Sequence, residues 1–392
     1  MKKRLFLGLA ALVAVTFTGC QKDQVINQTS ENTPIEFGTY VGRGAQTKVN
    51  TSIDGLGDLA GKNFGVFAYY TEQVQYNPNN SPMNFMYNQK VIGVQSGTTY
   101  SWTYSPVKYW PNNPNDKVSF FAYAPYDTHL TSSHPAILLP VNNSEGDPKV
   151  TYVVQDDCEQ HVDLMYSKSN NTNVTKQTVE GNVKFDFAHA LSRIGFSAQI
   201  LNDIVAKDPT GSNNSNVSEN NQINTGETTV AIEEIELIGK FAKKGDLNLN
   251  GGIWGAISEI EENFIIKSSN LYKCITSESN TLKEKTLLNT SDGSDDKGYL
   301  MVIPQSFDGS DDAKALKIRV KYTVTTKDAN LNGGESKITN NIISDPFAIN
   351  FEQGKAYNFH LQLGLTSVKF TADVAQWEEG RDMAVNVPIN TK

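Results

Sequence analysis

A cysteine near the start of the chain stands in a pattern that predicts attachment of a lipid. Basic residues at 2–4 precede an uncharged run over 5–17, which has the length of a signal sequence and is too short to span a bilayer as a helix. The run ends in Thr18-Gly19-Cys20, and small residues before a cysteine suit a lipoprotein signal peptidase. We therefore expect residues 1–19 to be removed and Cys20 to carry a diacylglycerol. The alternative is an ordinary signal peptide that is cut nearby, with Cys20 incidental.

Histidines and clustered aspartates could bind a metal, but neither group has the spacing of a metal site. The motif Asp-Gly-Ser-Asp-Asp occurs at 292–296 and at 308–312, without the ligand spacing or the distal glutamate of an EF-hand. We interpret both copies as solvated turns, with calcium binding as the alternative. His189, flanked by apolar residues, is expected to be a hydrogen-bonded core or interface histidine. The other histidines are scattered, at 129, 134, 161 and 360.

The sequence carries no local signature of a catalytic nucleophile or of a phosphate-binding loop, so we predict no enzyme, no cofactor and no metal. Removal of residues 1–19 moves the formal charge from −9 to −12, because three basic residues and no acidic one are lost. An acidic chain without basic clusters argues against nucleic acid as a partner. Cys158 and Cys274 are interpreted as buried free thiols, with a disulfide between them as the alternative.

Short β-rich runs bounded by turn residues fill most of the remaining chain, whereas long apolar patterns with the helical period are scarce. Such runs are typical of an all-β fold of the sandwich class. The strands that we expect include residues 35–41, 63–70, 118–123, 183–187, 194–198 and 316–322.

The chain that remains after processing is long enough for two domains with separate cores. The polar stretch 20–33 cannot bury much apolar surface and is expected to be a flexible tether. Strands on either side of residues 187–193 are expected to belong to different sheets. We therefore predict an N-terminal domain over 34–190 and a C-terminal domain over 191–392.

Two segments near the ends of the chain each present one apolar face, because alternate residues of a strand share a face. The face of the first strand consists of Ile35, Phe37, Thr39 and Val41, and that of the terminal segment 383–390 consists of Met383, Val385, Val387 and Ile389. An apolar strand left in water is an aggregation hazard, whereas insertion into another molecule's groove gives it main-chain hydrogen bonds and burial. The terminal segment is therefore a candidate donor strand. The alternative is a strand that completes its own subunit's sheet.

Several short motifs follow the first strand in a fixed order. They are FGVFAY at 64–69, YWP at 109–111, VSFFAYAPY at 118–126, DLMYS at 163–167, FDFAHALSRI at 185–194, and the stretches 351–359 and 368–377. Together with the lipoprotein signal, their order and spacing resemble the fimbrillin-like family, the subunits of type V pili in Bacteroidetes. This resemblance covers most of the mature chain. It implies two tandem β-sandwich (transthyretin-like) domains in an elongated subunit.

The resemblance also implies a route of assembly. In this family a trypsin-like protease cuts after a basic residue in the loop that follows the first strand, and removal of that strand opens a groove. Arg43, between Gly42 and Gly44, is the best candidate for the cut because glycines make a loop accessible, and Lys48 is the runner-up. The alternative for Arg43 is a solvated loop arginine without a role.

The resemblance implies partners and a place in the cell as well. The expected partners are other pilus subunits, identical or paralogous, the trypsin-like protease, and surface ligands on host or bacterial cells. Before processing, the lipid would also hold the chain to the outer membrane. The expected location is therefore the surface of the outer membrane and then the fimbrium.

A competing function comes from the aromatic residues Tyr100, Trp102, Tyr104, Tyr109 and Trp110. Exposed aromatic side chains on a β-sandwich can stack on sugar rings, which would suit a non-polymerising, glycan-binding lipoprotein of the cell surface. We favour core packing for these residues, because aromatic side chains bury large areas. The leading hypothesis from the sequence is a structural pilus subunit that supports adhesion.

Overall fold

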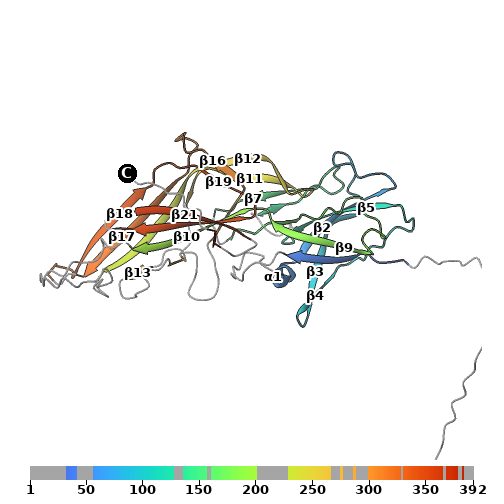
Figure 1. Cartoon of the computed structure of the whole chain (residues 1–392), viewed down its shortest axis with the longest axis horizontal. Helices are drawn as coiled ribbons and strands as arrows, with labels where there is room; N and C mark the ends of the chain where they lie inside the picture. Colours follow the sequence, from blue (N-terminus) through green and yellow to red (C-terminus); the bar gives the residue numbers. More distant parts are fainter. Residues whose placement is uncertain are drawn as a thin grey trace, which may run out of the picture. The chain divides into compact units, whose positions relative to one another are not determined.

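The computed structural model describes residues 32–41, 56–127, 136–156, 160–200, 228–265, 274–276, 286–287, 299–327, 330–364, 368–377 and 382–383. Almost all regular structure in these stretches is β-strand, and α1 (Leu56–Lys62) is the single α-helix among them (Figure 1). The prediction of an all-β fold is confirmed. No helix in the described part of the chain has the length and apolarity needed to cross a membrane.

The first strand lies at the edge of a seven-stranded sheet. In spatial order its strands are β1 (Glu36–Val41), β9 (Asn182–His189), β8 (Met165–Ser167), β5 (Lys117–Ala124), β2 (Phe64–Glu72), β3 (Met86–Ser96) and β4 (Thr99–Thr103). Neighbouring strands are antiparallel except β1 and β9, which run parallel. Parallel strands cannot be joined by a tight turn, which is why these two come from distant parts of the sequence.

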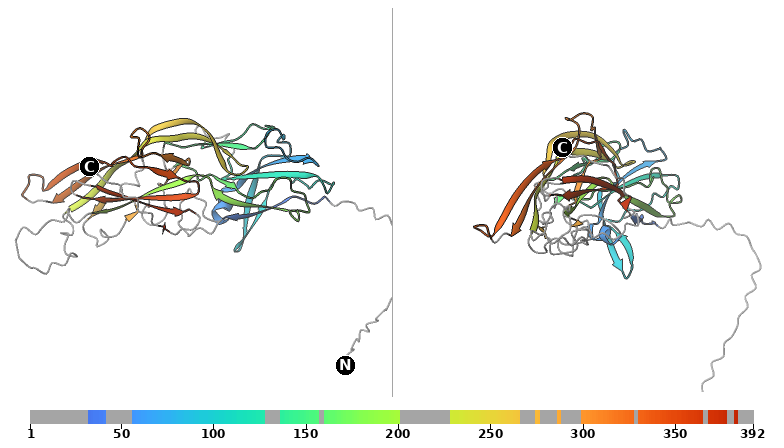
Figure 2. Two further views of the ribbon diagram at one scale, coloured as in Figure 1. Left: turned by 45° about the horizontal axis from the view of Figure 1, so that its top comes forward. Right: turned by 60° about the vertical axis from the view of Figure 1, so that its left-hand side comes forward.

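A second seven-stranded sheet is built around one long strand. Its strands are β18 (Glu335–Ile343), β17 (Lys317–Lys327), β11 (Thr228–Asn248), β7 (Lys149–Val153) and β6 (Ile137–Leu138), with β12 (Ile253–Ile265) and β13 (Cys274–Thr276) also paired to β11. Strands β11 and β12, drawn in yellow, run side by side over most of their length (Figure 2). All pairs in this sheet are antiparallel.

A third sheet contains the last strands of the chain. Its strands are β14 (Thr286–Leu287), β10 (Ser192–Ile200), β20 (Lys355–Leu363), β21 (Val368–Gln376) and β22 (Asp382–Met383), with β15 (Leu300–Val302) also paired to β10. Strands β10 and β20 are parallel over eight residue pairs, from Arg193 opposite Ala356 to Ile200 opposite Leu363. A small two-stranded sheet pairs β16 (Gln305–Phe307) with β19 (Ile349–Phe351).

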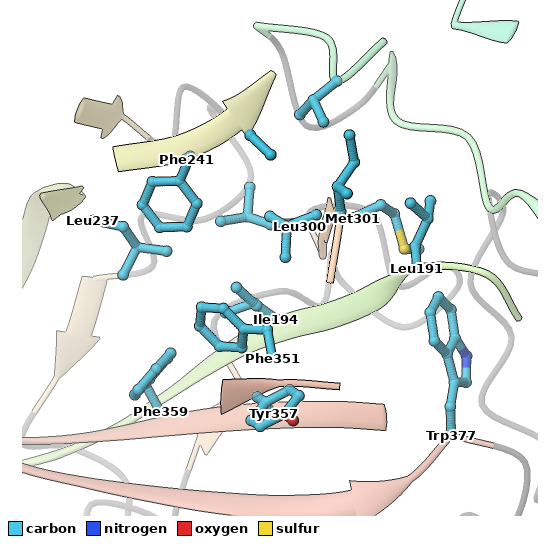
Figure 3. Close-up of a cluster of buried hydrophobic side chains, with 14 of the residues drawn as sticks. Leu191, Ile194, Leu237, Phe241, Leu300, Met301, Phe351, Tyr357, Phe359 and Trp377 are labelled. Carbon is cyan, nitrogen blue, oxygen red and sulfur yellow. The ribbon is translucent and has the colours of Figure 1, made fainter. Parts of the chain in front are cut away.

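The buried apolar side chains form two clusters that share the middle of the first sheet. On β2, Phe64, Val66 and Ala68 belong to the smaller cluster, whereas Phe67 and Tyr69 belong to the larger one. Alternate residues of β2 therefore point into different cores, which explains why the strand is a continuous apolar run rather than an alternating one. Figure 3 shows part of the larger cluster, where side chains from β10, β11, β15, β19 and β20 meet.

The predicted division at 190/191 falls where the chain changes sheets. Strand β9 ends at His189 in the first sheet, and β10 begins at Ser192 in the third. Strands β6 and β7 precede this point in sequence but pair within the sheet of β11. The described residues from Thr33 onwards form one compact unit by their contacts. The two-domain division stays a prediction, and the expected tether over 20–33 lies almost entirely outside the described residues.

The turn between β11 and β12 is fixed by glycine and by a carboxylate from a distant loop. Gly252 has a φ of 66°, and a Cβ at this position would clash with the Tyr166 ring. The carboxylate of Asp147 accepts hydrogen bonds from Asn248 Nδ2 at 2.8 Å and from Asn250 Nδ2 at 2.9 Å. It also accepts one from the Tyr76 hydroxyl at 2.9 Å, so a single carboxylate joins two otherwise separate segments.

Replacement of Asp147 should therefore destabilise the fold. In Asp147→Ala, three donors lose their acceptor, and we expect the free energy of unfolding to fall by about 2–3 kcal/mol. Asp147→Asn keeps one acceptor oxygen and should lose less. Urea unfolding followed by circular dichroism measures the difference, and wild-type stability in Asp147→Ala would contradict the role given to this carboxylate.

Candidate functional site

The candidate site is the first strand, β1, together with the residues that surround it. Strand β1 pairs with β9 in register from Glu36 opposite Asn182 to Val41 opposite Phe187. Among the described strands it has no other neighbour in its sheet. A strand at the edge of a sheet is held by main-chain hydrogen bonds along one side only.

The inward face of this strand forms part of the smaller core. Ile35, Phe37 and Val41 are 1%, 5% and 7% exposed. Thr39 is half-buried, and its hydroxyl oxygen is buried without a hydrogen-bond partner. The structure thus places the four residues of the predicted first-strand face on the core side of β1.

Phe37 is the centre of this face. Its ring centroid lies 5.1 Å from that of Tyr104, 5.5 Å from that of Phe185 and 6.1 Å from that of Phe120. Aromatic pairs at these distances stabilise a core beyond their buried area alone. If β1 were absent, the rings of β5 and β9 would border an apolar groove.

The outward face of β1 is polar and exposed. Glu36 is exposed and the Tyr40 side chain is 53% exposed. Beside the strand lies a pocket of about 490 Å³, lined by residues of β1, of β4 and of the start of α1 and β9. Its lining residues are Glu36, Phe37, Gly38, Thr39, Leu56, Tyr100, Ser101, Trp102 and Asn182. The pocket therefore adjoins β1 from Glu36 to Thr39.

The candidate terminal donor strand begins within the described residues. Met383 lies in β22, which pairs with β21 through Met383 opposite Val374 and Asp382 opposite Ala375. The start of this segment is thus paired within its own subunit. Val385, Val387 and Ile389 lie outside the described residues.

Three other predicted site residues, Cys20, Arg43 and Lys48, also lie outside the described residues. Val41, the last residue of β1, is the last described position before Arg43. Of the two remaining cysteines, Cys274 lies in β13 and Cys158 is not described.

His189 and Trp377 form a buried junction that the sequence indicated only in part. The ring planes of His189 and Trp377 are stacked, with 3.9 Å between centroids and 4° between planes. His189 Nδ1 lies 3.0 Å from Asp163 Oδ1, and the three side chains are at most 3% exposed. The prediction of a hydrogen-bonded core histidine is confirmed. The Arg193 guanidinium also lies over the Trp377 ring, 5.1 Å from its centroid.

The aromatic residues weighed for sugar binding mostly serve the smaller core. Trp110 is 4% exposed and packs on Phe120, and Trp102 packs edge-on against Phe64 at 5.0 Å. Tyr109 is exposed, but it stands without an aromatic partner among the described ring contacts. Core packing is thus the role that these contacts support.

The second acidic motif forms a turn whose carboxylates are already engaged. Asp308 accepts hydrogen bonds from the Ser310 N–H and hydroxyl, and these bonds hold its pKa below the usual value. Asp311 pairs with Lys314 at 3.0 Å, and Asp312 with Lys317 at 2.8 Å. Within the described residues, no cluster of three or more His, Cys, Asp or Glu side chains could hold a metal. The first copy, 292–296, lies outside them.

Comparison with known proteins places this architecture in a class. The chain superimposes on a fimbrial protein of Bacteroides vulgatus with a TM-score of 0.62 and 21% sequence identity, covering 88% of this chain and 99% of that one. A likeness at this identity shows the shared fold.

The family follows from the sequence comparison. The family model described as fimbrillin-like matches residues 58–377, so the chain belongs to the fimbrillin-like family. The chain is also 27% identical over 407 aligned residues to the fimbrium subunit Fim1C of Phocaeicola vulgatus, covering 97% of this chain and 98% of that protein. The resemblance inferred from the short motifs is confirmed.

The contacts of Phe37 predict a large effect of its truncation. Phe37→Ala would leave a cavity among the rings of Tyr104, Phe120 and Phe185, and we expect a loss of about 3–5 kcal/mol in the free energy of unfolding. Tyr40→Ala, in the same strand but on the exposed face, is the matched control and should change stability by less than about 0.5 kcal/mol. If chemical unfolding shows the same loss of free energy for both variants, the Phe37 side chain does not pack in the core as described.

Proposed function

We propose that this protein is a structural subunit of a cell-surface fimbrium, and that subunits polymerise by exchange of their first strand for a strand of a neighbour. The observation that carries the proposal is the position of β1. Within its sheet β1 is paired on one side only, yet Phe37 and Val41 of this strand, together with Ile35 just before it, supply three buried apolar side chains to the core. Membership of the fimbrillin-like family and the name of the Phocaeicola relative support the same function.

Departure of β1 would leave a groove that exposes the main-chain groups of β9 together with the rings of Phe120 and Phe185. Another strand with an apolar face is needed to fill this groove. The stripe of Met383, Val385, Val387 and Ile389 offers four apolar side chains at the spacing of a strand. Burial of four such side chains contributes on the order of 6–10 kcal/mol before the cost of ordering the segment. Strand addition of this type is a recurring mode of protein association.

For the terminal segment to act in a neighbour, its start must leave its own sheet. Only two residue pairs join β22 to β21 among the described residues. Release of the segment would therefore break the pairing of Met383 with Val374 and of Asp382 with Ala375.

Export and processing complete the proposal. The precursor is carried to the outer membrane by the lipid on Cys20, and a trypsin-like protease then cuts after Arg43, with Lys48 as the runner-up site. The cut falls just beyond Val41, the last residue of β1, so it separates the strand from the rest of the chain. The mature subunit has neither enzymatic activity nor a cofactor, and it does not bind nucleic acid. Its partners are other subunits and surface ligands that support adhesion.

Proteolysis in vitro tests the proposal. We expect limited trypsin treatment of the lipid-free chain to yield a core that starts at Gly44, followed by ladders of polymers on a gel run without boiling. Arg43→Ala should prevent polymerisation, while Lys48→Ala, a matched change in the same segment, should leave it intact. Removal of residues 383–392 should permit cleavage but abolish the ladder.

Two outcomes would refute strand exchange. One is a fully cleaved protein that remains monomeric at high concentration. The other is unchanged polymerisation after removal of residues 383–392. If Lys48→Ala rather than Arg43→Ala prevents assembly, the cleavage site moves to Lys48 and the mechanism stands.

A further inference from the structure

The residues just before β1 are held by a second segment, on the side away from β9. We call residues 104–110 the clasp. The Ile35 N–H donates to the Lys108 carbonyl at 2.9 Å, and the Trp110 N–H donates to the Thr33 carbonyl at 2.9 Å. These bonds form an antiparallel bridge in which Pro34 lies opposite Tyr109. The residues that lead into β1 are thus bonded to the clasp, whereas β1 itself pairs with β9.

Tyr104 adds a side-chain contact to this bridge. Its hydroxyl donates to the Ile35 carbonyl at 2.9 Å and accepts from the Lys108 N–H at 3.3 Å. Burial raises the pKa of Tyr104 above its usual value, so the hydroxyl remains a donor at neutral pH. Its ring also packs on Phe37, as described above. One side chain therefore ties the clasp to both the backbone and the core face of the first strand.

Three further hydrogen bonds reinforce the same end of the strand. The Gly181 carbonyl accepts from the Glu36 N–H at 3.3 Å and from the Trp110 indole N–H at 3.1 Å, which joins the clasp to the residue just before β9. The Lys176 ammonium donates to the Thr33 hydroxyl at 2.5 Å. At the opposite end of the strand, the main-chain pairing of Val41 among the described residues is with Phe187 of β9.

We propose that the clasp retains the first strand after the chain has been cut behind it, so that departure of the strand, and not cleavage, sets the rate at which the groove opens. The proposal rests on the strand-exchange function proposed above. A cut beyond Val41 frees the end of the strand that is remote from the clasp, and the strand peels from Val41 towards Ile35. The clasp contacts are the last to break. A cut subunit therefore keeps its groove covered until the clasp yields.

Release of the strand can be measured without any polymerisation. The full mature chain with Cys20→Ser carries a fluorescent dye on its N-terminal amine, and a recognition sequence for a site-specific protease is inserted after Arg43. Loss of the labelled fragment after cleavage is followed by fluorescence anisotropy. An excess of unlabelled synthetic peptide with the sequence of residues 30–43 occupies each vacated groove and blocks both rebinding and strand exchange.

We expect cleavage to be complete well before the fragment leaves. Tyr104→Phe removes one hydroxyl and keeps the ring on Phe37, and it should speed release about 5- to 10-fold, the effect of one buried hydrogen bond. Lys176→Met, at an exposed position whose change does not threaten folding, should speed release about 2- to 3-fold. Tyr109→Phe removes an exposed hydroxyl from the same clasp and should release the fragment at the wild-type rate.

The proposal is overturned if the wild-type fragment leaves as fast as it is cut, or if it stays bound in every variant. Equal rates in wild type, Tyr104→Phe and Lys176→Met also overturn it. A failure of this proposal can be distinguished from a failure of the proposed function. If release follows the expected order but polymers fail to form once the competing peptide is omitted, strand exchange is wrong and the clasp stands.

Discussion

The parallel pairing of β1 with β9 is the constraint on which the candidate site depends. It puts a short strand from the beginning of the chain beside one that lies far along the sequence, and it closes the smaller core with Ile35, Phe37 and Val41. Since β1 lies at an edge, the same strand completes the core and pairs within its sheet with β9 alone among the described strands. A central strand could complete the core, but it could not leave without breaking ladders on both sides.

The sequence predicted the strands better than their partners. Alternation in 35–41 and the apolar runs at 63–70 and 118–123 indicated strands that the structure contains, because side-chain periodicity is a local property. Which strands would pair could not be predicted in this way. The parallel partner of β1 and the union of β6 and β7 with β11 depend on contacts between residues distant in sequence.

In the candidate site, too, local features could be predicted from the sequence but long-range contacts could not. The apolar face of β1 could be assigned from its spacing alone, and His189 could be assigned from its apolar neighbours. The clasp could not, because its key bonds join backbone groups of Thr33 and Ile35 to residues 108–110. Only the aromatic character of Tyr104 and Trp110 hinted that this segment is buried. The stacking of Trp377 on His189 likewise joins residues that no local pattern connects.

The two residues between β9 and β10 have a mechanical consequence. Ala190 and Leu191 are fully buried, and their carbonyls accept hydrogen bonds from the Trp254 indole at 2.8 Å and from the Gly354 N–H at 2.9 Å. If a neighbouring subunit's strand replaces β1, tension along a fibre enters through β9 and passes directly into β10. Strand β10 is bonded to β20 over eight residue pairs, which share a pull along the strand rather than failing one by one. On the proposed function, the short buried link between His189 and Ser192 would pass a pull on β9 directly to β10.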